Sequence, residues 1–189
     1  MSELKLSFDY STAQWVLSII VGVCLSKVYS VVAHHIRYRK ETVFYLPYLM
    51  LVAQTLLSLL FVWFQSPSGY QMVEVNKLGF LTKVITDSLA VIFTLVALPD
   101  EQILSKDKLD LKVIYYDAKK TWIIIWMIWF ISGVTLSLFF GPEEFRNMLI
   151  GSIVITLVLA ILMLKFANDY LHAGFHLLNV AQMTPYLLV

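Results

Sequence analysis

Long apolar runs alternate with short polar segments along most of this chain. A helix needs about 20 mostly apolar residues to cross the hydrocarbon core of a bilayer. Five segments meet this requirement, at residues 14–33, 43–64, 78–98, 121–140 and 147–166. The pattern predicts an all-α fold, a polytopic bundle of five transmembrane helices, in a single domain that covers residues 1–189.

Two further segments are longer than turns. Residues 99–120 begin at Pro99, which ends the third apolar run, and their apolar spacing predicts a short helix that runs into the fourth span. Residues 167–189 follow the fifth run. They either extend its helix into the cytoplasm or bend and lie on the membrane surface.

Basic residues gather on one side of the predicted membrane. Arg37, Arg39 and Lys40 follow the first run, five lysines follow the third, and Lys165 ends the fifth. The positive-inside rule then puts the N-terminus outside and the C-terminus, with both longer segments, in the cytoplasm. We expect a multi-pass protein of the cell inner (plasma) membrane, with the lipid bilayer as its surroundings.

Composition agrees with this class and excludes others. Apolar residues make up 59% and charged residues 14% of the chain, against about 45–50% and about 25% in a soluble domain. A net charge of +1 without a basic stripe argues against a nucleic-acid partner. The single cysteine, Cys24, excludes an intramolecular disulfide and a cysteine-rich metal site.

The third apolar run contains two charges, Lys83 and Asp87. Each helical residue turns by about 100°, so the polar and small residues of this run share about one-third of the circumference. They are Gly79, Lys83, Thr86, Asp87, Ala90, Thr94 and Ala97. Because a charge that faces hydrocarbon is costly, this stripe faces other helices or water. It is either an ion path, proton site or ligand counter-charge, or a closed Lys–Asp pair that fixes helix packing.

Other polar positions predict helix contacts. The first run carries a small residue at every fourth position, which allows close packing within the chain or between copies in a homo-oligomer; the four are Ser18, Gly22, Ser26 and Ser30. Gln54 in the second run is expected to hydrogen-bond the third span. Trp122 fits the interfacial aromatic belt. Trp126 and Trp129 are expected in packing or lipid-facing surface, with an aromatic ligand wall as the alternative.

The histidines raise the question of a metal. Asp169, His172 and His176 share one helical face, which could supply three ligands, and His34 or His35 could add a fourth. This spacing is shared by many helices, so we expect a surface or interface role and no metal or other cofactor. No Gly-x-Ser-x-Gly, phosphate-binding loop or serine with a plausible base occurs, so neither an enzyme nor catalytic residues are predicted.

Three stretches carry a resemblance: VGVCLSKVYSVVAHHIRYRKETVFYLPYLM, ALPDEQ and LDLKVIYYDAKKTW. A first helix with Gly and Ser, a basic Arg-x-Arg turn and an aromatic entrance to the second helix resemble an uncharacterised family of small bacterial five-helix membrane proteins. The likeness covers roughly the first two-thirds of the chain. It implies the five-helix layout, and it implies no activity and no functional residue.

Three classes of function remain. The first is a homo-oligomeric, channel-like or membrane-effector protein. The second is a non-conducting membrane subunit or sensor that recruits a cytoplasmic protein partner, for example in a bacterial antiphage system. The third is a membrane metal or redox protein that uses His172 and His176. The small size and the polar stripe favour the first class over the second by a narrow margin.

Overall fold

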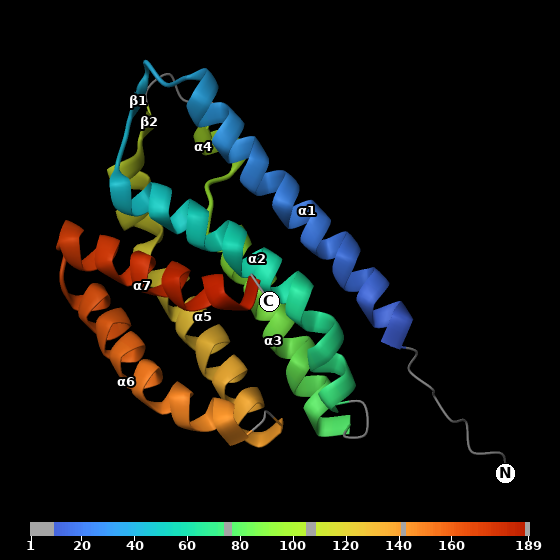
Figure 1. The fold of residues 1–189 in the computed structure, drawn as a ribbon. Helices are drawn as coiled ribbons and strands as arrows, with labels where there is room; N and C mark the ends of the chain where they lie inside the picture. Colours follow the sequence, from blue (N-terminus) through green and yellow to red (C-terminus); the bar gives the residue numbers. More distant parts are fainter. Residues whose placement is uncertain (1–9, 74–76, 105–108, 141–142, 188–189) are drawn as a thin grey trace, which may run out of the picture.

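The computed structural model describes residues 10–73, 77–104, 109–140 and 143–187, and it is almost entirely helical (Figure 1). The elements follow the chain in the order α1 (Tyr10–Arg37), β1 (Thr42–Val43), α2 (Leu46–Val73), α3 (Lys77–Ala97), α4 (Glu101–Leu104), β2 (Leu109–Asp110), α5 (Leu111–Phe140), α6 (Glu143–Lys165) and α7 (Asp169–Leu187). Each predicted apolar segment falls on a helix, and the all-α class is confirmed.

Four of the described helices are long and apolar enough to cross a membrane, namely α1, α2, α3 and α5. The apolar part of α6 that is described, Ile153–Lys165, is shorter than a full span. These helices fit a membrane-spanning protein. A fifth span and the orientation of the chain stay predictions.

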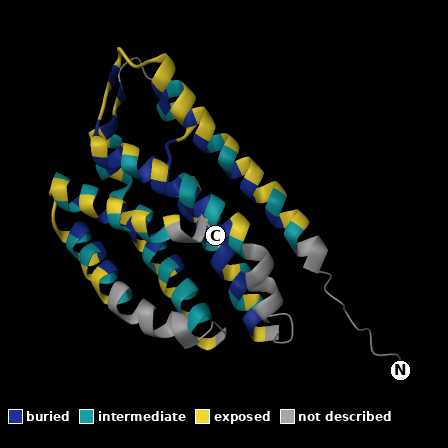
Figure 2. Ribbon diagram, viewed as in Figure 1, coloured by how far each residue is buried: buried dark blue, intermediate teal, exposed yellow. Residues whose placement is uncertain are grey.

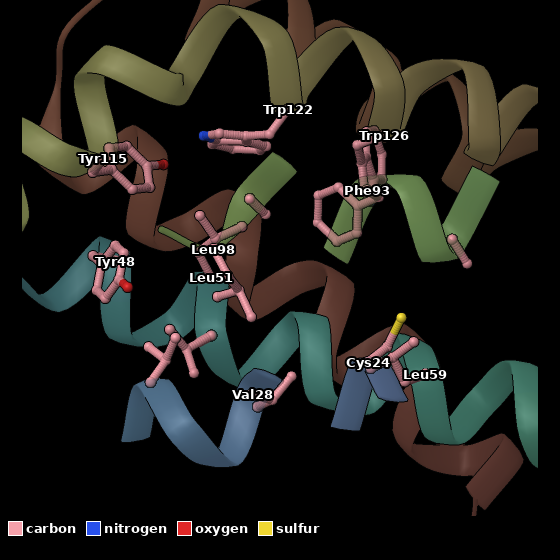
Figure 3. Packing of buried hydrophobic residues seen from close by; sticks show 14 of the residues in the cluster. Cys24, Val28, Tyr48, Leu51, Leu59, Phe93, Leu98, Tyr115, Trp122 and Trp126 are labelled. Atoms are coloured by element: carbon pink, nitrogen blue, oxygen red, sulfur yellow. The ribbon is translucent and has the colours of Figure 1, made fainter. Parts of the chain in front are cut away.

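Helix α3 lies at the centre of the bundle. It packs most extensively against α5 and α2, whereas α1 lies along α2 and touches α3 less (Figure 1). The outward side of α1 is exposed along most of its length (Figure 2). The core between the helices is built from aliphatic and aromatic side chains, among them Trp122 and Trp126 of α5 and Phe93 of α3 (Figure 3).

The start of α5 is fixed by a cap and a short strand pair. Asp110 Oδ1 accepts hydrogen bonds from the backbone N–H groups of Lys112 and Val113, at 2.9 and 3.3 Å, as an N-cap does. Strands β1 and β2 pair in parallel, which joins the turn after α1 to this cap. The predicted short helix before the fourth span is therefore the first part of one continuous helix, α5.

Helix α7 turns back after α6 and packs in the bundle, so the expectation that residues 167–189 extend the preceding helix is wrong. The position of this segment relative to the membrane surface stays a prediction. The backbone N–H groups of Tyr170 and Leu171 donate to Asn168 Oδ1, which caps the new helix after the turn. Helix α7 then packs along α2 and also contacts α6. Near its far end Ser58 lies 3.7 Å from the sulfur of Met183. The return occurs because one face of α7, including Phe175 and Asn179, can be buried only against other helices.

The position expected for Trp122 is also wrong. Its side chain is 0% exposed, whereas a belt residue faces the membrane interface. Its ring centroid lies 5.4 Å from that of His176 and 5.6 Å from that of Tyr115. The sequence could not reveal this burial, because α7 covers this part of α5 only once the chain has turned back.

Candidate functional site

The polar stripe of α3 lies inside the chain. All seven of its residues are buried, and Lys83 and Asp87 are only 5% and 3% exposed. Helix α5 covers part of the stripe, where Thr86 Oγ1 lies 2.5 Å from Ser132 Oγ. Thr94 Oγ1 donates to the backbone oxygen of Ala90 in its own helix at 3.0 Å. The stripe therefore faces other helices of the same chain.

Lys83 and Asp87 form a closed ion pair. The ammonium Nζ lies 2.5 and 2.6 Å from the two carboxylate oxygens, one helical turn away. Coulomb attraction is much stronger in a buried site than in water, but two buried charges also lose their hydration. The pair is electrically neutral as a unit, so it can remain among apolar helices where either charge alone could not.

Gln54 does not reach α3, contrary to expectation. Its Oε1 lies 2.6 Å from Nδ1 of His176 on α7. The physical reason is the return of α7, which places a polar partner beside the middle of α2. The intramembrane candidates thus separate into two groups, with Lys83, Asp87, Thr86 and Thr94 on α3 and Gln54 in a different cluster.

That cluster is a continuous series of hydrogen bonds, which we name the histidine chain. The hydroxyl of Tyr115 lies 2.7 Å from Nδ1 of His172 and 2.9 Å from Nε2 of His176. At one end of the series, His172 Nε2 lies 3.0 Å from the backbone oxygen of Phe166. At the other end, His176 Nδ1 contacts the side-chain amide of Gln54. The four side chains are almost fully buried. The chain joins α2, α5 and α7 at one place.

The protons available for the hydrogen bonds of the histidine chain can be counted. Between the oxygens of Phe166 and Gln54 there are four hydrogen bonds, each of which needs one proton. Two neutral imidazoles and one phenol supply three. The series is complete when the Gln54 amide turns its N–H groups towards His176, or when one imidazole takes up a further proton. Neutral histidines therefore require Gln54 to act as a donor.

Asp169 belongs to a separate group at the exposed edge of the same helices. Its carboxylate accepts hydrogen bonds from the hydroxyls of Tyr45 and Tyr116, at 2.8 and 3.0 Å, and pairs with Lys112 Nζ at 3.0 Å. The hydrogen bond from Lys112, and then that from Tyr45, hold the pKa of Asp169 below its usual value. Burial, and then the hydrogen bonds to Tyr116 and Asp169, raise the pKa of Tyr45.

The candidate metal ligands thus have other partners. The Tyr115 hydroxyl lies between His172 and His176, while Asp169 binds Lys112 and two tyrosines. Among the residues that the structure describes, no group of three His, Cys, Asp or Glu side chains is placed to hold a metal ion. The third class of function, a metal or redox protein, has no geometric support in that part of the chain.

The small-residue stripe of α1 lies on its outer side. Gly22, Ser26 and Ser30 are exposed, and a Cβ built on Gly22 would meet no atom within 4 Å. Ser18 donates to the backbone oxygen of Gln14. The buried side of α1 carries the aliphatic residues and Cys24 instead. Packing within the chain is therefore not the role of this stripe, and contact between copies stays a prediction.

Several residues of these clusters were not found from the sequence. They are Tyr45, Tyr115, Tyr116 and Ser132. The adjacent Tyr115 and Tyr116 at the start of α5 are visible in the sequence as amphipathic residues near a membrane boundary. Nothing in their spacing indicates that residues 57 and 61 positions further along would lie beside Tyr115.

Comparisons with protein-family models, with curated proteins and with solved structures gave no match to this chain. The resemblance to small bacterial five-helix membrane proteins stays a prediction.

Removal of one charge of the buried pair should destabilise the bundle strongly. We expect Asp87→Asn and Lys83→Met each to lower the free energy of unfolding by about 3–5 kcal/mol, because the remaining charge is left buried without its partner. The double variant Lys83→Met/Asp87→Leu should recover much of this loss. Thermal unfolding in detergent measures the effect.

The exposed pair Lys112–Asp169 is the matched control, with side chains 52% and 44% exposed. Lys112→Met should change the unfolding temperature less than Lys83→Met, because solvent screens exposed pairs. If the two lysine variants lower the unfolding temperature equally, burial does not increase the contribution of the Lys83–Asp87 pair to stability.

Removal of one hydroxyl should break the histidine chain. Tyr115→Phe leaves two buried imidazole nitrogens without a partner, so we expect a loss of about 1–3 kcal/mol in the free energy of unfolding. Tyr116→Phe is the control, because Asp169 keeps Tyr45 and Lys112 as partners, and it should cost less. The ¹⁵N shifts of His172 and His176 should move in Tyr115→Phe and not in Tyr116→Phe.

Proposed function

We propose that this chain is an integral membrane protein that does not conduct ions itself and acts as a membrane subunit or sensor that recruits a protein partner. The single observation that carries the proposal is the buried ion pair of Lys83 and Asp87 inside the helix bundle. An ion path would need these charges to face water.

The packing around the pair supports this reading. Helices α2 and α5 flank α3, and Phe93 of α3 packs against Trp122 and Trp129 of α5. A second copy of the chain could reach the α3 stripe only if the bundle opened. The polar groups hold the helices together and do not line a route through them.

A groove beside α4 supports the recruitment of a partner. It has a volume of about 500 Å³ and lies where α3, α4 and the start of α5 meet. Val96, Ile103 and Val113 contribute apolar surface, and Asp100 and Asp117 contribute carboxylates. Such a groove suits a segment that is apolar on one side and basic on the other. The positive-inside rule puts it in the cytoplasm.

A homo-oligomeric, channel-like protein is the second candidate. The observation in its favour is the exposed small-residue side of α1, where Gly22, Ser26 and Ser30 would allow a close helix contact with another copy. In that arrangement a path would run between subunits, so the two candidates differ in whether the purified protein conducts.

We expect the purified protein in liposomes to pass monovalent ions no faster than protein-free liposomes do. Asp87→Asn should leave this rate unchanged while it lowers the unfolding temperature, because the carboxylate has a packing role. Asp100→Asn, which alters an exposed carboxylate, is the matched control, and a pore-forming peptide verifies the assay. Conduction by the wild type that Asp87→Asn alters would favour the channel-like candidate.

We expect a photo-reactive residue at Val113, in the groove, to cross-link the chain in native cells to one soluble protein of defined mass. The same residue at Val154, an exposed apolar position on α6, should give no such product. Asp117→Lys should reduce the Val113 product if carboxylates attract the partner. Cross-links from Val113 to copies of this chain alone would contradict recruitment and favour a homo-oligomer.

A further inference from the structure

A second groove lies between α1 and α2, on the side away from α3. It has a volume of about 510 Å³, and nearly all of its surface is apolar. Val28 and Val32 of α1 form one wall, and Val52, Ala53 and Leu56 of α2 form the other. The two helices separate towards the end of α1 (Figure 1), where the residues that line the groove are located.

Arg39 and His35 line one end of this groove. Arg39 follows α1 by two residues, and His35 lies one turn earlier. Within the described part of the chain Arg39 pairs with no carboxylate. His35 is 4% exposed, its Nδ1 has no hydrogen-bond partner, and its Nε2 lies 3.4 Å from the Tyr48 hydroxyl. A buried polar nitrogen without a partner in the protein is uncommon.

The polar end of the groove coincides with the membrane boundary. The apolar part of α1 that can span a membrane ends at Arg37. Arg39 therefore lies at the level of lipid headgroups, and the aliphatic walls formed by Val32 and Leu56 lie at the level of acyl chains. This placement holds whichever side of the membrane the end of α1 faces. Basic pockets between membrane helices of this kind bind anionic lipid headgroups.

We propose that the groove between α1 and α2 is a binding site for one anionic phospholipid. An acyl chain lies along Val32, Val52 and Leu56, and the phosphate group accepts hydrogen bonds from the Arg39 guanidinium. The guanidinium fork matches phosphate geometry and stays charged at all physiological pH values. His35 lines the same end of the groove beside Arg39.

The charge and shape of the groove favour a lipid over a helix of a second copy. An anionic lipid supplies a negatively charged partner for Arg39. Its flexible acyl chain can fill an irregular apolar groove. The outer side of α1 is apolar or small at this level and carries no carboxylate between Gln14 and Arg37. A second copy seated through its α1 would leave Arg39 without an anion.

The test measures lipid binding to the delipidated protein in detergent by native mass spectrometry. We expect phosphatidylglycerol to bind about tenfold more tightly than phosphatidylcholine, because both lipids carry the phosphate but the choline ammonium of phosphatidylcholine offsets its negative charge beside Arg39. Arg39→Gln should abolish this preference. Arg37→Gln removes a neighbouring charge that does not line the groove, and it should keep the preference.

A second pair of variants tests the acyl part of the site independently of charge. Ala53→Trp fills the groove and should reduce binding of both lipids at least about tenfold. Ala33→Trp places the same side chain at an exposed position of α1 outside the groove, and it should leave binding unchanged. Circular dichroism and gel filtration establish that each variant is folded.

Three results would overturn the proposal. One is equal affinity of the wild type for the two lipids. Another is a preference for phosphatidylglycerol that survives Arg39→Gln. The third is a lipid-free wild-type dimer that Ala53→Trp converts to monomers, since a second copy would then occupy the groove. If Arg39→Gln does not fold, the proposal is tested by lipid binding to Ala53→Trp and Ala33→Trp. Equal lipid binding by these two variants would then contradict it.

Discussion

Each polar group buried in this bundle needs a partner from the protein, because hydrocarbon offers none. Among the described residues the constraint is met in two places, whereas Nδ1 of His35 and the indole nitrogens of Trp122 and Trp126 are buried without a partner. On α3 a lysine and an aspartate one turn apart satisfy each other. Where α2, α5 and α7 meet, two imidazoles, a phenol and an amide form one series of hydrogen bonds. Both arrangements are internal to the chain, and the second one joins α2, α5 and α7.

The second arrangement explains the position of α7. A helix with His172, His176 and Asn179 buried on one face would be unstable against lipid, and on the membrane surface it would leave Phe175 exposed. Packing on α2 buries the apolar residues and supplies Gln54 and Tyr115 as polar partners. At the entrance, Asp169 is held by Lys112 and two tyrosines, so the first turn of α7 is fixed at the edge of the bundle.

The sequence predicted the parts of this structure that depend on local pattern. The apolar runs located the helices, and the 100° projection placed Lys83, Asp87 and Thr94 on one side of α3, where all are buried. It failed where partners come from distant parts of the chain. Gln54 and His176 are 122 residues apart, and each alone suggests something else, a contact with α3 for one and a metal ligand for the other. Small residues at every fourth position of α1 left open whether the contact is within the chain or between copies, because that spacing marks a smooth helix face and not the direction in which the face points.

Helix α1 is attached differently from the others, and both proposals depend on this. It buries aliphatic residues, Cys24 and His35 against its neighbours. Lys27 adds the polar contact, with Nζ 3.0 Å from Asp100 and 3.1 Å from the backbone oxygen of Leu95, at the negative end of the α3 dipole. Near its end α1 separates from α2 and leaves the groove beside Arg39. Asp100 also lines the groove near α4. A lipid that shifts α1 would also shift Lys27 and its ion-pair partner Asp100. Because Asp100 lines the groove proposed for the protein partner, lipid binding could then change the affinity for that partner.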